Sequence, residues 1–88
     1  MKVQAKFDFL MDPGHGWVKV PKALLKDLGI QSKISSYSYQ RGEFAYLEED
    51  CDAGEFIVAY KEKFGDVPKF RDRFSESSRV RNYESYSA

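Results

Sequence analysis

WVKVPKALLKDLG, residues 17–29, changes its periodicity at Pro21, and this change indicates the fold class. Residues 17–20 have the alternation of a short strand, whereas the three leucines after the proline fall at helical spacing. Pro21 suits the first turn of a helix, where its missing N–H costs nothing, and Gly29 suits the left-handed position that ends a helix. A helix of two turns is marginal on its own, so its leucines are expected to pack on a sheet.

Alternating patterns on either side of this stretch predict further strands. Residues 2–9 place apolar and polar side chains on opposite faces, and an Asp-Pro-Gly turn ends the pattern. Residues 34–39 and 44–47 flank a short segment that contains Gly42, which predicts a hairpin. Residues 69–74 alternate phenylalanines with cations, which predicts a last strand at or near a sheet edge.

One longer helix is expected over residues 53–64, where apolar side chains recur at helical spacing and Gly65 follows as a left-handed end residue. Asp52 has the spacing of a capping box, so its carboxylate is expected to accept the first free N–H groups of the helix. These elements predict a single α+β domain over residues 1–74, with a mainly antiparallel sheet of four or five strands and two helices on one face. Residues 75–88 are expected to form a polar C-terminal arm or a frayed tail.

The composition favours a small globular domain without a charge excess. The 88 residues include 14 Lys and Arg against 14 Asp and Glu, which argues against a general polyanion binder. No apolar run approaches the roughly 20 residues of a membrane span, and no apolar leader opens the chain. The one cysteine, Cys51, fits a reducing compartment. We therefore expect a cytoplasmic protein with no membrane partner.

The sequence offers few groups that could catalyse a reaction. His15 is the only imidazole, and its two flanking glycines favour a structural turn. Cys51, the only thiol, lies in an acidic run that is expected to raise its pKa. No phosphate-binding glycine loop and no paired zinc-ligand motif is present. We expect no enzyme, no cofactor and no metal, and an enzyme that uses His15 and Cys51 is the least favoured alternative.

Charge is segregated along the chain, and this segregation suggests a binding role. The acidic run after residue 47 would either cap the next helix or form a negative patch for a basic partner, and it lacks the spaced ligands of a calcium loop. The C-terminal third combines cations with tyrosines, which suits recognition of a protein or a nucleic acid, unless it is simply a solvated sheet face. The candidate partner contacts are Glu48, Glu49, Asp50, Arg71, Arg73, Arg79, Arg81, Tyr83 and Tyr86.

Two resemblances add an expectation about function. Residues 16–30 contain a strand that ends in Val-Lys-Val-Pro and a short helix that closes on Leu-Gly-Ile. This stretch resembles the AbrB/SpoVT (MazE-like) family, which implies a swapped-hairpin dimer that binds DNA through basic residues. Further motifs are HGW at 15–17, SYSYQRG at 36–42 and YLEEDCD at 46–52. With these motifs and the Ser-Arg to Tyr ending at 78–86, the chain resembles a family of small bacteriophage and mobile-element proteins.

The second resemblance and the charge pattern together suggest stoichiometric binding to a host protein or protein complex. Small phage proteins without catalytic groups often block a host defence complex, as anti-CRISPR and antirestriction proteins do. The alternative is a DNA-binding regulator or antitoxin of the AbrB/MazE type, which would be an obligate dimer with strongly salt-dependent DNA affinity. A homodimer is a further option, and nucleic acid is otherwise not the expected partner.

Overall fold

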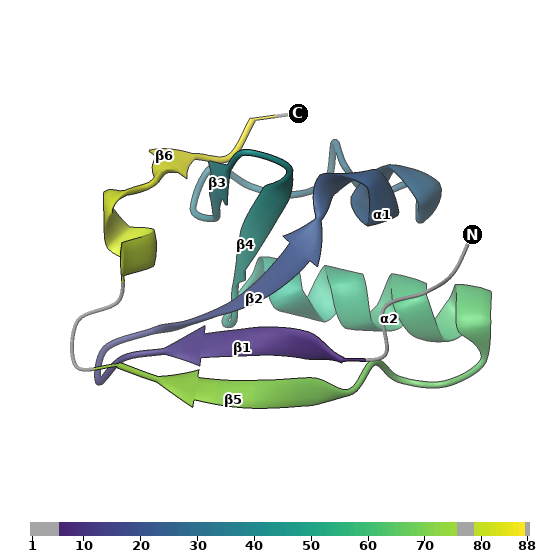
Figure 1. Cartoon of the computed structure of the whole chain (residues 1–88). Helices are drawn as coiled ribbons and strands as arrows, with labels where there is room; N and C mark the ends of the chain where they lie inside the picture. Colours follow the sequence, from purple (N-terminus) through teal and green to yellow (C-terminus); the bar gives the residue numbers. More distant parts are fainter. Residues whose placement is uncertain (1–5, 76–78, 88) are drawn as a thin grey trace.

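A computed structural model of the chain describes residues 6–75 and 79–87. The strands are β1 (Phe7–Met11), β2 (Gly16–Pro21), β3 (Tyr39–Arg41), β4 (Phe44–Glu48), β5 (Phe70–Phe74) and β6 (Glu84–Ser85). The helices are α1 (Lys22–Asp27), α2 (Asp52–Phe64) and the short 3-10 helix η1 (Arg79–Asn82) (Figure 1). The expected α+β class is confirmed. The part of the first expected strand that precedes residue 6, with Val3 and Ala5, lies outside the described residues.

The six strands form one mixed sheet in the order β5-β1-β2-β4-β3-β6. Every neighbouring pair is antiparallel except β1 and β5, which run parallel. The sheet therefore has six strands where four or five were expected, because β6 of the C-terminal segment pairs with β3. The parallel pair arises because α2 connects β4 to β5, and a helical crossover returns the chain in its original direction.

Both helices cover the same face of the sheet. Phe7, Leu25 and Phe56 are fully buried and belong to one apolar cluster, to which β1, α1 and α2 all contribute. The rings of Phe7 and Phe56 meet edge to face with centroids 5.2 Å apart. The leucine stripe of α1 thus packs on the sheet as its sequence predicts, and Gly29 ends this helix with φ at 73°.

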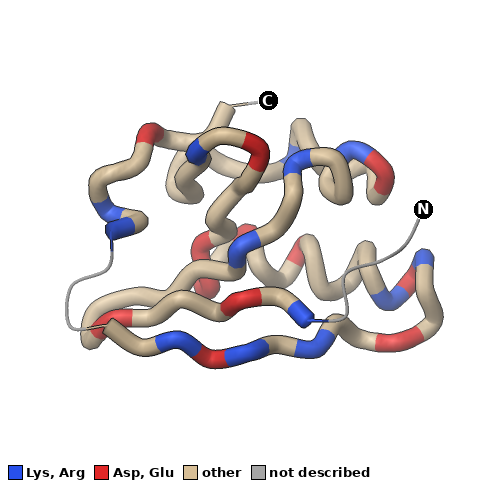
Figure 2. Tube along the Cα trace, in the orientation of Figure 1, with Lys and Arg blue, Asp and Glu red and all other residues tan. Residues whose placement is uncertain are grey.

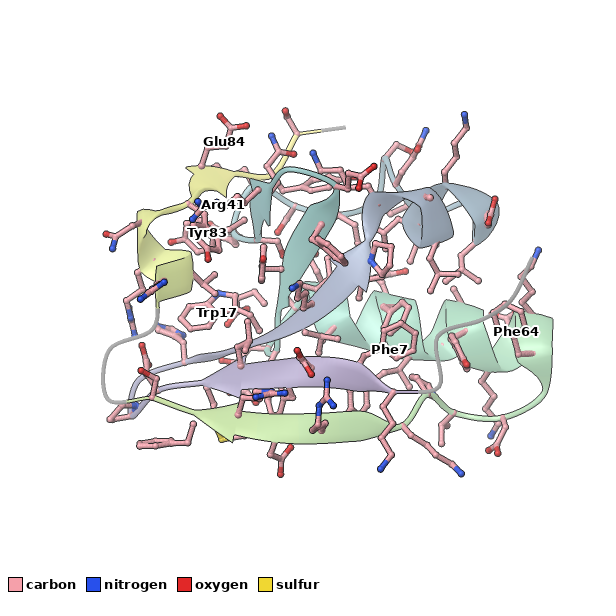
Figure 3. The ribbon with its side chains drawn as sticks, viewed as in Figure 1. Phe7, Trp17, Arg41, Phe64, Tyr83 and Glu84 are labelled. Atoms are coloured by element: carbon pink, nitrogen blue, oxygen red, sulfur yellow. The ribbon has the colours of Figure 1, made fainter. Side chains whose placement is uncertain are left out.

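The opposite face of the sheet carries a second, aromatic cluster, which the C-terminal segment covers. Trp17 of β2, Tyr46 of β4 and Val80 of η1 are its buried members, and Tyr83 packs against them. In Figure 3, Trp17 lies toward η1, whereas Phe7 lies toward α2. Residues 79–87 therefore form a packed arm, and the remaining residues of the expected arm, 76–78 and 88, lie outside the described part.

Two local predictions around Asp52 are wrong, and they have one cause. Asp52 is only 2% exposed and does not cap α2, since no side-chain hydrogen bond caps this helix. Its carboxylate instead accepts hydrogen bonds from the N–H and hydroxyl of Ser35, at 3.0 and 2.7 Å, and from the hydroxyl of Ser38. These bonds hold residues 35–38 in turns, so the expected strand over residues 34–39 begins only at Tyr39.

The 13-residue helix α2 matches the expected helix, and Gly65 ends it with φ at 83°. Within the described residues, neither α1 nor α2 has the length and apolar character needed to cross a bilayer.

Candidate functional site

The outer side of β5 presents backbone groups to solvent. β5 is the last strand of the sheet, and the backbone of Lys69 and of Ser75 bonds to β1 at 2.9 Å. Because successive residues of a strand direct their backbone groups to alternate sides, those of Phe70, Asp72 and Phe74 point away from β1. No strand within residues 6–75 and 79–87 pairs with that side. We call this outer side of Phe70–Phe74 the β5 edge.

Two exposed arginines flank the β5 edge on the face away from the helices. Arg71 is in register with Asp8, which alternates with the core residue Phe7 and so lies on that face. The Asp8 carboxylate lies 2.9 Å from Arg71 and 3.7 Å from Arg73, and these arginine side chains are 56% and 53% exposed. One carboxylate therefore neutralises two cations only in part, and the blue segments along β5 in Figure 2 mark the resulting basic strand.

A groove of about 260 Å³ connects the end of β5 with the C-terminal segment. It is lined by Arg73 and Phe74 of β5, by Arg79 of η1 and by Tyr83, among others. Phe74 is 65% exposed, which is unusual for a large apolar side chain. The ring of Tyr83 is tilted against that of Tyr46, with centroids 5.0 Å apart, and the guanidinium of Arg41 lies over the Tyr83 ring at 5.1 Å (Figure 3). The structure thus brings Arg73, Arg79 and Tyr83 together around one groove.

Two other candidate contacts have partners inside the molecule. Tyr86 is only 6% exposed, and its hydroxyl donates a hydrogen bond of 2.6 Å to the carbonyl of Gln31. Burial and then the charge of Asp52 raise the pKa of Tyr86. Arg81 donates from Nε and Nη2 to Asp12, at 2.7 and 2.9 Å, and these bonds raise its pKa. Tyr86 is therefore a core residue, and Arg81 stabilises the turn that follows β1.

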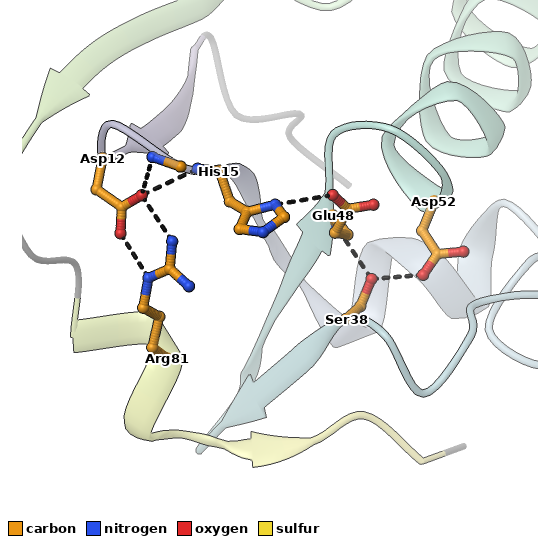
Figure 4. A network of polar contacts seen from close by, with 7 residues as sticks. Asp12, His15, Ser38, Glu48, Asp52 and Arg81 are labelled. Carbon is orange, nitrogen blue, oxygen red and sulfur yellow. Dashed lines mark hydrogen bonds and ion pairs between the residues drawn. The ribbon is translucent and has the colours of Figure 1, made fainter.

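The acidic residues at the end of β4 and in the turn after it lie against the turn that carries His15. Oε1 of Glu48 is 3.6 Å from Nδ1 of His15. One ligand atom from each of His15, Glu48 and Asp50 lies within 4.8 Å of the other two. The N–H of Glu49 donates to the carbonyl of Gly16 at 3.0 Å, which joins the two segments. His15 is far from Glu48 in the sequence, so only the fold reveals their contact, which Figure 4 shows.

A pocket of about 450 Å³ next to this cluster contains the chain's only imidazole and only thiol. Its lining includes His15, Cys51, Glu48 and the ring of Trp17. The His15 side chain is 49% exposed, Cys51 is exposed, and the negative charge of Asp52 is the main cause that raises the pKa of the thiol. The raised pKa disfavours the thiolate, and no hydrogen bond in the described part of the chain joins the thiol to the imidazole.

Comparison with known proteins gives no relative from which a function could be transferred. No family model matches the chain, and no curated protein and no solved structure matches it significantly. The chemistry of the β5 edge and of the His15 cluster therefore carries the functional argument.

Proposed function

We propose that this protein acts by stoichiometric binding of another protein, and that the partner adds an extended segment to the β5 edge. The observation that carries the proposal is the row of outward backbone groups at Phe70, Asp72 and Phe74. An exposed strand edge of this kind can pair with a strand of a second chain. Main-chain hydrogen bonds then supply affinity, and the side chains that alternate beside them supply specificity.

The side chains of β5 define the chemistry of the partner segment. Arg71 and Arg73 face one side of the sheet, so acidic side chains opposite them would complete two opposite-charge pairs. Each cross-strand pair of this kind contributes about 0.2–1 kcal/mol. Phe70, Asp72 and Phe74 share the other side, where apolar side chains fit beside the two phenylalanines at either end. The expected partner segment therefore alternates acidic with apolar residues and is about as long as β5, which has five residues.

Charge disfavours a second copy of this chain as the occupant. In antiparallel pairing of two β5 edges, residues with outward backbone groups pair with one another. The registers that pair Asp72 with Phe70, Asp72 or Phe74 of the other copy each place Arg71 or Arg73 opposite an arginine or Lys69 of that copy. Like charges directly opposite one another destabilise a strand pair. A partner protein with the complementary acidic pattern is therefore the favoured occupant.

Inhibition of a host defence complex is the proposed consequence of this binding. The resemblance to small bacteriophage and mobile-element proteins supports this setting, in which the protein would act in the cytoplasm and without catalysis. The exposed arginines, the groove beside Phe74 and the acidic residues after β4 supply a charged outer surface for such a partner.

A proline substitution tests the pairing without disturbing the sheet. Asp72→Pro removes an N–H that points away from β1, and proline is tolerated where the N–H side of an edge strand faces solvent. The matched control, Asp72→Ala, removes the same side chain but keeps the N–H. A partner is first isolated on the tagged full-length chain at moderate salt, and its affinity for each variant is then measured by calorimetry.

We expect Asp72→Ala to bind the partner with the affinity of the wild type. Asp72→Pro should lose at least about tenfold in affinity, because the main-chain hydrogen bond from residue 72 is lost and the adjacent hydrogen bonds to the partner are weakened. Equal affinity of the two variants would exclude the β5 edge as the docking surface. Recovery of nucleic acid alone, with binding that falls steeply as salt is added, would instead favour the DNA-binding regulator.

A further inference from the structure

We propose that His15, Glu48 and Asp50 together bind a divalent transition-metal ion of the zinc class. Each residue offers one ligand atom, and the three atoms lie within 4.8 Å of one another. The imidazole comes from the turn after β1 and the two carboxylates from the end of β4 and the turn that follows it. The inference does not depend on strand pairing at the β5 edge, since none of these residues belongs to that edge.

The separations suit a single ion. Ligand atoms about 2.0–2.2 Å from a tetrahedral zinc ion lie roughly 3.3–3.6 Å apart. Nδ1 of His15 and Oε1 of Glu48 are already 3.6 Å apart, so these two atoms have the spacing of zinc ligands without movement of either segment. Asp50 is exposed and lies in a turn, so rotation of its side chain closes the remaining distance.

Both segments that carry the ligands are fixed by hydrogen bonds. The N–H groups of Gly14 and His15 donate to Oδ1 of Asp12 at 2.9 Å, and Arg81 holds the same carboxylate. The N–H of Glu48 donates to the hydroxyl of Ser38 at 3.0 Å, and this hydroxyl in turn donates to Asp52 (Figure 4). The backbone around two of the three ligands is therefore held in place before an ion arrives, which lowers the ordering cost of binding.

The charge and type of the ligands select the class of ion. With a neutral imidazole the cluster carries two negative charges, and Asp50 has no ion-pair partner among the described residues. An imidazole favours zinc, nickel or copper over magnesium and calcium, which prefer oxygen ligands alone. Three protein ligands leave a coordination position for water, for which the adjoining pocket has room.

The test is a titration of the tag-free full-length chain with zinc chloride. His15 is the only histidine, so its ring signals in an NMR spectrum report on the site without assignment of the rest of the chain. Calorimetry measures stoichiometry and affinity for the wild type, His15→Ala, Asp50→Asn and the control Glu62→Gln. Glu62 is an exposed carboxylate on α2 outside the cluster.

We expect one ion per chain, a shift of the His15 ring signals on titration and weaker binding of magnesium. Affinity should fall at least about tenfold in both ligand variants and stay unchanged in Glu62→Gln. Cys51→Ser should also keep the affinity of the wild type, because the thiol is outside the cluster. Absence of binding at millimolar zinc, retention of affinity by His15→Ala, or loss of affinity in Cys51→Ser would overturn the assignment.

Discussion

Substitution of Asp52 by alanine tests whether a single buried carboxylate organises the segment between α1 and β4. In the folded protein this carboxylate is 2% exposed and accepts three hydrogen bonds from Ser35 and Ser38. Ser38 is fully buried, and its carbonyl also accepts the N–H of Tyr86 at 2.8 Å. Loss of the carboxylate would therefore affect both the serine turns and the C-terminal arm.

The structure allows the size of the effect to be worked out. The buried hydroxyl of Ser38 would lose its acceptor, which costs about 1–3 kcal/mol. The N–H and hydroxyl of Ser35 are less buried and would regain bonds to water, so their loss adds only about 1 kcal/mol. We expect Asp52→Ala to lower the free energy of unfolding by about 2–4 kcal/mol, which for a domain of this size lowers Tm by roughly 10–20 °C.

The assay is urea denaturation followed by circular dichroism, with chelator present to remove metal ions. Asp50→Asn is the matched control, because it changes a neighbouring carboxylate that is exposed and accepts no hydrogen bond from the described residues. It should change the free energy of unfolding by less than about 0.5 kcal/mol. A loss below about 1 kcal/mol in Asp52→Ala would refute the argument that Asp52 organises this segment.

Three further predictions concern stability. Tyr86→Phe removes the hydrogen bond to Gln31 and should cost about 1 kcal/mol at neutral pH. Burial raises the folded-state pKa of Tyr86 above the usual 10.0, so the wild type should lose stability as pH rises above about 10. Unfolding curves at several pH values should show a smaller loss of stability with pH in Tyr86→Phe. Gly65→Ala should lower the free energy of unfolding by about 1 kcal/mol, since φ of this residue is 83°. Gly54→Ala should raise it by about 0.5–1 kcal/mol in urea denaturation, because Gly54 lies on α2 with open space around its Cβ position. Arg81→Lys should lower Tm in a thermal melt, because lysine keeps the charge beside Asp12 but cannot donate from two nitrogens of one planar group. Arg81→Met also removes the charge and should lower Tm further. Equal melting temperatures for the wild type and Arg81→Met would contradict this.

Strong local patterns were enough to predict most of the elements. The leucine spacing after Pro21 gave α1, the apolar stripe before Gly65 gave α2, and the alternation of residues 69–74 gave β5 at a sheet edge. Each of these segments is amphipathic with a single period, and its ends are marked by proline or glycine. Periodicity of this kind depends only on neighbours along the chain, so the sequence alone reveals it.

The candidate site could be predicted only in part. Arg71 and Arg73 lie on the exposed strand that their pattern indicated, and Glu48 and Asp50 lie in the acidic run. Nothing in the sequence indicated that His15 would meet these two carboxylates. Ligands from separated turns converge only after the sheet has formed, and no spacing rule relates them.

The sequence by itself thus determined most of the helices and strands, including α1, α2 and β5, because amphipathic periodicity is a local property. The tertiary structure alone decided that Asp52 binds two serines, that β5 runs parallel to β1, and that Tyr86 is buried in the core. These features depend on contacts between residues distant in sequence, where the alternatives differ by only a few hydrogen bonds. Packing of the whole chain selects among such alternatives, and a local pattern does not.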